Sequence, residues 1–537
     1  MRAGRFSYRE GLPTWERPGC VVHRGEALPF APNRGSKKET GGPRLLRVAI
    51  VSDTHGYSVL DTALPTQWTR NTNVLRNKTL LAPDYGVMYV AAFLKSRAFE
   101  GLDLQVINLV ADIFGEVELY RDVGEGPPHE GSDCPLNCEE RRAEARSYLR
   151  DALRDYDPQV ILYPLSFYYL ALHAREALKE IKETVPGAWL VTGGAYATLH
   201  AREVLGDGAA DFVVRGEGEW TTLELLRAIE RGEVEFSRIH GLSWRRDGAS
   251  FHNRPREREN DIDLFPHMYT VAEEFKIGLR HRILNELRTY EDYIPGNGML
   301  TSRGCYGACT FCLDPVLWGR RTRYHSPEYV RRAVEFCWNN YPDENRLFYF
   351  GDATFVTGRS RFFKMLDGLK GIPYAYNAQT RTESLSPQVL RAMAECNFAT
   401  VGMGVESFND AVLRDSVRKR SSREEVLRAA REARDLGMRA ILTFIVGLPG
   451  EDRDSIEESL EILHREGIVD AAFFPLVVFR GTELYERLVA RSTPEELEEL
   501  RLTPWSEEYY MVGEEFPTVA SLVRYADELN LRVREPS

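Results

Sequence analysis

The chain has 537 residues, of which 43% are apolar and 28% are charged, and its formal net charge is −12. This balance is typical of a globular protein of two or three domains and excludes a mostly disordered chain, a collagen-like chain and a small disulfide scaffold. The acidic charge argues against a protein that coats nucleic acid. The sequence has no apolar run of about 18 residues and no apolar N-terminal signal segment. We therefore expect no integral membrane segment, a cytoplasmic location and reduced cysteines.

Residues 1–44 are rich in Lys, Arg, Gly and Pro without a period, and we expect a flexible N-terminal arm. From residue 45 to residue 235, short apolar strands alternate with amphipathic helices, which predicts a Rossmann-like α/β domain with a parallel sheet. Ligands of such sheets lie beyond the carboxyl ends of the strands. The predicted ends are residues 52–57, 164–167, 193–195 and 216–218.

The alternation stops at residues 236–297, where turns and charged residues predict a connector with a small hairpin over 240–253. Residues 298–478 form a second alternating block of six strand–helix units, which predicts a (β/α)6 partial TIM barrel. The remaining residues, 479–537, are predicted to form a small helical C-terminal region.

The sequence TSRGCYGACTFC places Cys305, Cys309 and Cys312 directly after the first strand of the second block. Barrels of this kind carry their chemistry on loops at that end of the strands. Three thiolates suit a soft metal or an iron–sulfur cluster, whereas structural zinc normally takes four ligands. No fourth Cys or His lies beside the three, so a cluster with one open iron is favoured over zinc. Gly304 and Gly307 allow the backbone to bend closely around such a cluster.

The other five cysteines are less informative. Cys134 and Cys138 share one loop, which we expect to hold a free or loop-stapling pair rather than a metal. Cys337 and Cys396 fall on apolar helix faces and are expected in the core. Cys20 belongs to the N-terminal arm.

The CxxxCxxC motif, with Phe311 before its last Cys, resembles that of the radical S-adenosylmethionine (SAM) superfamily. The resemblance implies that the three cysteines hold a 4Fe–4S cluster whose open iron chelates SAM. It further implies that reductive cleavage of SAM yields a 5′-deoxyadenosyl radical.

Later strand ends resemble the SAM-contacting elements of this superfamily, in the same order. The implied cofactor-binding residues are Gly351 and Asp352 at the methionine amino group, Gln379 and Arg381 as side-chain contacts, Gly404, Glu406 and Ser407 near the ribose or methionine, and Gly447 and Pro449 near adenine. Taken singly, each of these short motifs is also typical of an ordinary strand end or turn. The resemblance identifies no catalytic residue.

The first domain resembles the cobalamin-binding domain that precedes the barrel in one subgroup of the superfamily. The matching stretches are APDYGVMYVAAFLKSR, LVTGGAYATLHAREVL and DFVVRGEGEWTTLELL. The resemblance implies that cobalamin binds at Gly193, Gly194, Gly216 and Glu217. A scaffold domain that has lost cobalamin is the alternative.

His55 follows the first strand in an Asp-x-His sequence that resembles the lower cobalt ligand of cobalamin-dependent mutases. Ser58 departs from this pattern, which has Gly at that position. The alternative is a loop histidine that contacts the corrin or the backbone, with Trp68 and Arg70 over the lower corrin face.

The resemblance covers about residues 45–478 and implies a cobalamin-dependent methyltransferase that acts on an unactivated carbon of a biosynthetic intermediate. The alternatives are a cobalamin-containing oxidative cyclase or ring-rearranging enzyme, a radical SAM enzyme without cobalamin, and a redox- or iron-sensing binding protein. The implied partners are a small-molecule substrate and an electron donor such as flavodoxin or ferredoxin, without nucleic acid.

Overall fold

The computed structural model describes residues 45–52, 85–109, 112, 139–165, 171–278, 297–341, 346–490, 493 and 519–534, with the side chains of 139–145, 171–174 and 519–520 excepted. The expected arm over 1–44, His55, Trp68, Arg70, Cys134 and Cys138 lie outside the described residues. None of the described helices combines the length and the hydropathy that a membrane span requires.

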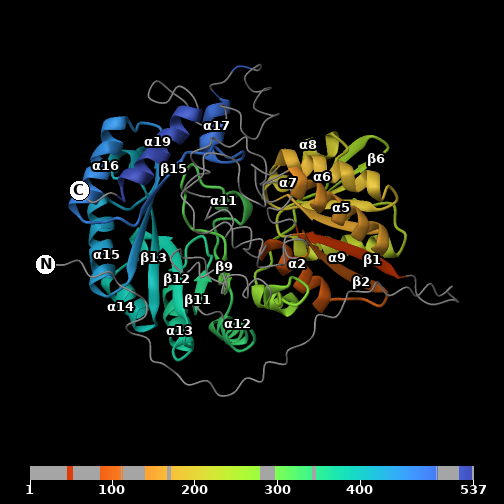
Figure 1. Ribbon diagram of the computed structural model, residues 1–537, viewed down its shortest axis with the longest axis horizontal. Helices are drawn as coiled ribbons and strands as arrows, with labels where there is room; N and C mark the ends of the chain where they lie inside the picture. The colour runs from red at the N-terminus through yellow and green to blue at the C-terminus, as the bar shows by residue number, and fades with distance from the viewer. Residues whose placement is uncertain are drawn as a thin grey trace. The chain divides into compact units, whose positions relative to one another are not determined.

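A seven-stranded sheet, the first sheet, is built from the N-terminal part of the chain (Figure 1). Its order is β2-β1-β3-β4-β5-β6-β7, and the first five strands in this order run parallel. The parallel strands are β1 (Leu46–Ser52), β2 (Leu102–Asn108), β3 (Val160–Pro164), β4 (Trp189–Gly193) and β5 (Phe212–Val214). The apolar run of β1 is almost wholly buried, as expected of a central parallel strand covered on both faces.

Strand β1 pairs with both β2 and β3, so the direction in which strands are added reverses between β1 and β3. Ligands of open α/β sheets bind at such a switch point. The loops that follow these two strands, 53–84 and 166–170, lie outside the described residues. The helices of this part are α2 (Tyr85–Ser96), α5 (Glu139–Tyr156), α6 (Ala171–Thr184), α7 (Ala195–Leu199), α8 (Ala201–Gly206) and α9 (Gly218–Glu230).

The hairpin expected in the connector extends the first sheet. Strands β6 (Leu242–Arg246) and β7 (Ala249–His252) pair antiparallel, and β6 also pairs antiparallel with β5. Aromatic packing accounts for this placement, because Phe236 lies against both Phe212 of β5 and Trp244 of β6, with ring centroids 5.0 and 5.5 Å apart.

A second sheet has six strands in the order β15-β14-β13-β12-β11-β8, and every neighbouring pair is parallel. The strands are β8 (Asn297–Met299), β11 (Leu347–Phe350), β12 (Ala375–Arg381), β13 (Phe398–Glu406), β14 (Arg439–Val446) and β15 (Ala471–Pro475). They alternate with α12 (Pro327–Asn340), α13 (Arg359–Leu369), α14 (Pro387–Glu395), α15 (Arg423–Asp435) and α16 (Arg453–Arg465). Figure 1 shows α14, α15 and α16 along one face of this sheet.

Local sequence signals place the starts of these helices. Ser422 and Glu425 form a reciprocal capping box at α15, and Asp452 and Ser455 form another at α16. Ser326 caps α12, which has Pro327 at its first position.

The two faces of the second sheet differ in burial. Along β14, Leu442, Phe444 and Val446 are buried toward the helices, whereas the alternate side chains are partly exposed. We call the partly exposed side the open face; it carries Gln379, Gly402, Gly404, Ile441, Thr443, Ile445 and Phe474. Parallel sheets usually have both faces covered, so an open face over a parallel sheet is a place where a ligand can bind.

The C-terminal helix α19 (Val519–Arg532) covers the edge strand of the second sheet. The amide of Asn530 acts as a strand substitute, because its Oδ1 accepts from the Phe473 N–H at 2.8 Å and its Nδ2 donates to the Phe473 carbonyl at 2.8 Å. These two bonds satisfy backbone groups of β15 that would otherwise form an open sheet edge.

Replacing Asn530 with Ala should lower the free energy of unfolding by roughly 1–3 kcal/mol, because it leaves both backbone groups of Phe473 without their partner. Urea unfolding measures this change. The matched control is Asn340→Ala on the exposed end of α12, which we expect to cost less than about 0.5 kcal/mol. Equal costs for the two variants would contradict the edge-capping role.

Candidate functional site

The three predicted ligand cysteines lie on one loop, residues 304–322, between the short antiparallel strands β9 (Ser302–Arg303) and β10 (Arg323–Tyr324). We call this segment the cysteine loop. Gly304 begins it with φ of 96°, and a Cβ there would lie 2.8 Å from the Arg321 carbonyl oxygen and 2.9 Å from that of Gly319. The Cys305 N–H donates to the Gly319 carbonyl at 3.2 Å, so the two ends of the loop are in direct contact. Only glycine fits this position, because its positive φ and the two close carbonyl oxygens leave no room for a side chain.

The middle of the loop is held by the helical turn Val412–Val417, which follows β13. Thr310 donates from its N–H to the Val417 carbonyl at 3.1 Å and from its hydroxyl to the Ser416 carbonyl at 2.8 Å. Cys309 and Phe311 pack against a small apolar cluster of Val412, Val417, Leu448, Leu476, Val478 and Leu484. The aromatic residue of the motif is therefore a packing residue that fixes the backbone between Cys309 and Cys312.

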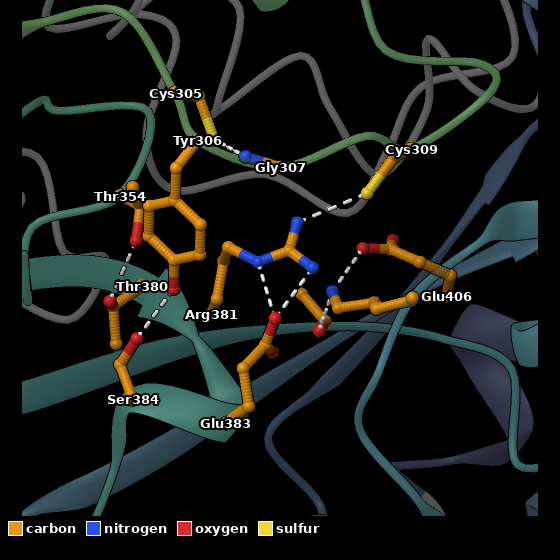
Figure 2. Close-up of polar contacts among 12 residues, drawn as sticks. Cys305, Tyr306, Gly307, Cys309, Thr354, Thr380, Arg381, Glu383, Ser384 and Glu406 are labelled. Carbon is orange, nitrogen blue, oxygen red and sulfur yellow. Dashed lines mark hydrogen bonds and ion pairs between the residues drawn. The ribbon is translucent and has the colours of Figure 1, made fainter. Parts of the chain in front are cut away.

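Arg381, at the end of β12, reaches the cysteine loop directly. Figure 2 shows its guanidinium between the loop and Glu383. Nη1 donates to the Cys309 sulfur at 3.1 Å, and Nε and Nη2 both contact the Glu383 Oε1 at 2.6 Å. The Tyr306 ring covers the guanidinium, with its centroid 5.5 Å from the Arg381 Cζ. The Tyr306 hydroxyl lies 2.9 Å from the Ser384 hydroxyl. These contacts fix the Arg381 guanidinium and, through it, the position of the Cys309 sulfur.

The donor set suits an iron–sulfur cluster. Burial raises the pKa of the Cys305 and Cys312 thiols, and binding of iron would release their protons. Among the residues that the structure describes, no three His, Cys, Asp or Glu side chains surround a point where one metal ion would bind. A cluster needs no such point, because each thiolate binds a different iron.

Asp352 lies beneath the start of the cysteine loop and not on the open face. Its carboxylate is fully buried and accepts from the Thr301 N–H and hydroxyl at 3.1 Å, and from the Ser302 hydroxyl. Burial raises the pKa of Asp352, and these hydrogen bonds oppose the rise. Gly351 precedes it, with its N–H bonded to the Met299 carbonyl at 2.9 Å. Contact between these two residues and SAM stays a prediction.

The G-x-E-S segment forms a polar contact that the sequence did not reveal. Glu406 has φ of 68°, and its Oε1 accepts from the buried Lys419 ammonium at 2.7 Å. Lys419 also donates to the Gly404 carbonyl, and a Cβ on Gly404 would lie 2.8 Å from the Glu406 carboxylate. Arg381 and Gly404 are register partners, so this pair adjoins the arginine. Nothing in SVRKRSS distinguishes Lys419 from its two basic neighbours.

The remaining predicted SAM contacts are more dispersed. Gln379 is exposed on the open face, opposite Gly402 of β13. Ser407 is buried and donates to Glu451, a carboxyl that sequence analysis did not select. The Gly447 turn, with φ of 92°, lies against Leu522 of α19, and Pro449 is half-buried two residues later.

The predicted cobalamin residues lie at the carboxyl ends of β4 and β5. Gly194 has φ of 104°, and Gly216 has φ of 76° and is held by the Thr198 hydroxyl at 3.0 Å. A Cβ on Gly193 would lie 3.3 Å from the Val214 carbonyl oxygen. Glu217 differs from the three glycines, because its carboxylate is bound by Arg323 and adjoins Arg303.

These strand ends adjoin the cysteine loop and the end of β15. Arg480, to which sequence analysis assigns no role, contacts Glu203 of α8 at 2.6 Å and His200 at 3.1 Å. A Cβ on the adjacent Gly481 would lie 3.2 Å from Val316 of the loop and 3.7 Å from Leu199. The carboxyl ends of both sheets therefore meet around the cysteine loop.

Comparisons with known proteins show what the chain resembles. Residues 299–463 match the model of the Radical SAM superfamily. The chain is 28% identical over 346 residues to an uncharacterized methyltransferase of Pyrococcus horikoshii, a match covering 63% of this chain and 71% of that protein. It is 25% identical over 450 residues to the cytidylyl-2-hydroxyethylphosphonate methyltransferase of Streptomyces wedmorensis, covering 76% and 79%. It is 24% identical over 292 residues to the anaerobic magnesium-protoporphyrin IX monomethyl ester cyclase of Synechocystis, covering 53% and 55%.

Among solved structures, the methyltransferase TsrM of Kitasatospora setae, with cobalamin and a [4Fe-4S] cluster bound, superposes with a TM-score of 0.60. The alignment has 15% identity and covers 88% of this chain and 83% of that chain. At this identity the likeness shows a shared fold.

Glu451 predicts a pH dependence of stability. Burial raises the pKa of its carboxyl from 4.5 to about 8, against the opposing hydrogen bond from Ser407. Because the folded chain holds this proton more tightly than the unfolded chain, the free energy of unfolding should fall as the pH rises from about 4.5 to about 8, by at most about 1.4 kcal/mol per pH unit. Urea unfolding at several pH values measures this slope.

Glu451→Gln should flatten the slope, since the amide cannot ionise. The control is Glu458→Gln on α16, the helix that begins just after Glu451, where the Glu458 side chain is exposed and paired with Arg423. An unchanged slope in the Glu451 variant would show that another group is responsible.

Proposed function

We propose that this chain, whose residues 299–463 belong to the radical SAM superfamily, is a cobalamin-dependent methyltransferase acting on an unactivated carbon of a small molecule. The superfamily uses a 4Fe–4S cluster and SAM. Cys305, Cys309 and Cys312 would hold the cluster. The observation that carries the proposal is the cysteine loop at the strand ends, with the Arg381 guanidinium 3.1 Å from the Cys309 sulfur.

Two features support cobalamin as the second cofactor. The glycines at positions 193, 194 and 216 leave the ends of β4 and β5 without side chains, which suits a large planar ligand lying close to the backbone. The relative from Kitasatospora setae, which shares the fold, binds both cobalamin and a cluster. When bound, the cluster would supply the electron that cleaves SAM, and cobalamin would supply the methyl group.

The chain's own residues would orient the reactants and exclude water. The open face carries small or neutral residues at Gly402, Ile441 and Thr443, against which SAM and substrate would lie. Glu406 and Lys419 form a shielded ion pair at the edge of this face, which would fix the end of β13 beside the ligands. Arg381 would hold the Cys309 sulfur in position through its hydrogen bond of 3.1 Å.

A second function is favoured by one observation, the similarity to the magnesium-protoporphyrin ester cyclase. An oxidative cyclase would use the same radical and would transfer no methyl group. Incubating the wild-type protein, loaded with cluster and reduced corrinoid, with SAM labelled in its methyl group separates the two. Transfer of label to the protein-bound corrinoid supports the methyltransferase, and cleavage of SAM without such transfer supports the cyclase or a radical enzyme without cobalamin.

Replacing Cys305, Cys309 or Cys312 singly with Ala should abolish 5′-deoxyadenosine formation from SAM under dithionite, because each removes one of three cluster ligands. Bound iron, 5′-deoxyadenosine and the unfolding midpoint are measured together, and the midpoint is expected to stay near that of the wild type.

The matched control is Cys337→Ala, which removes a thiol buried within α12 and should leave iron binding intact. Full SAM cleavage in any of the three loop variants would contradict the cluster assignment. Cleavage by the wild-type protein would exclude a sensor without enzymatic activity.

A further inference from the structure

Two arginines bracket the cysteine loop. Arg303 immediately precedes it and Arg323 immediately follows it, and the two are direct partners in the antiparallel ladder between β9 and β10. Like charges directly opposite each other on neighbouring strands are destabilising. The ends of the loop can therefore stay together only if anionic groups lie between or beside the two guanidinium groups.

Two glutamates at the start of α9, in the first domain, supply these anions. Glu219 contacts the Arg303 Nη2 at 2.6 Å. Glu217 receives two bonds from Arg323, one of them 3.0 Å long, and lies 3.5 Å from the Arg303 Nη1. Glu217 is the N-cap residue of α9, yet its side chain makes no capping bond. Its carboxylate is committed to the arginines instead.

All four side chains are shielded from water. Their side-chain exposures are 5% for Arg303, 4% for Arg323, 9% for Glu217 and 5% for Glu219. The Phe265 and Tyr89 rings lie 4.6 and 5.4 Å from the Arg303 guanidinium carbon. Removing one partner from such a group leaves a buried charge uncompensated, so the arrangement is intolerant of displacement.

Because the cysteine loop and α9 are tied by these buried contacts, a shift of the first domain would move both ends of the loop. We propose that Glu217 and Glu219 are positioning residues that fix the cluster-binding loop against the strand ends of the first domain. This inference rests on the proposed function for its purpose, which is to keep the site of SAM cleavage in register with the second cofactor. It extends that function by assigning the carboxylates of Glu217 and Glu219 to the loop, whereas Gly216 stays with the proposed cobalamin site.

Hydrogen exchange of the apo protein tests the inference without any cofactor. In Glu219→Gln, which keeps the shape of the side chain and removes its charge, backbone amides of residues 304–322 should exchange at least about tenfold faster than in the wild type. Amides of α15 should be unchanged. Glu219→Asp keeps the charge, so its loop amides should exchange more slowly than those of the Gln variant but faster than those of the wild type. If the Gln variant does not fold, the Asp variant still tests the inference.

Glu224→Gln is the matched control, because Glu224 lies on the same helix and pairs with Arg256, outside the cysteine loop. Its loop exchange should stay within about twofold of the wild type. Loop exchange in Glu219→Gln within about threefold of the wild type would overturn the inference. So would equal acceleration in the Glu224 and Glu219 variants.

A functional readout separates positioning from general stabilisation. In the loaded protein, Glu219→Gln should still cleave SAM but transfer less labelled methyl to the corrinoid per 5′-deoxyadenosine formed. If the methyl transferred per 5′-deoxyadenosine is unchanged although the loop amides exchange faster, Glu219 is not a positioning residue. A wild-type protein that fails to cleave SAM would contradict the proposed function and leave the exchange result standing.

Discussion

The bond from the Arg381 guanidinium to the Cys309 sulfur joins the cysteine loop to the carboxyl end of β12. Glu383 holds the guanidinium from the other side, and Tyr306 covers it. The rest of the loop is fixed by comparable constraints: the Gly304 return at its start, Asp352 beneath it, and Thr310 and Phe311 against the apolar cluster at its far side. A loop of three thiols held this way is organised before any ligand binds, which reduces the entropy lost on binding.

The second constraint is that both sheets end at this loop. Parallel strands present free backbone ends and glycine turns at one edge, and the edges of the two sheets are brought together by buried ion pairs around Arg303 and by Arg480. The open face of the second sheet then provides a surface that the described side chains do not bury. Chemistry that needs two cofactors and a substrate in one water-poor space is compatible with this arrangement.

The sequence analysis predicted the alternating architecture, because apolar strands and amphipathic helices differ in period. It located the cysteine loop, because three cysteines within one short segment are rare outside metal sites. It predicted the hairpin of β6 and β7 but not its attachment to the first sheet, since aromatic packing between Phe236 and Trp244, not local pattern, makes that attachment. It missed Lys419 and Glu451, whose roles depend on contacts across strands. It could not foresee that Glu217 would face Arg303 and Arg323, which lie about a hundred residues further along the chain.

The central claim is that one chain holds a cluster and a corrinoid at the same site. Anaerobic reconstitution with iron, sulfide and hydroxocobalamin, followed by desalting and absorbance measurement of both, tests it most directly. About four irons and about one corrinoid per chain are expected. Iron without corrinoid would contradict the two-cofactor account and leave the first domain as a scaffold for a radical enzyme of a different kind.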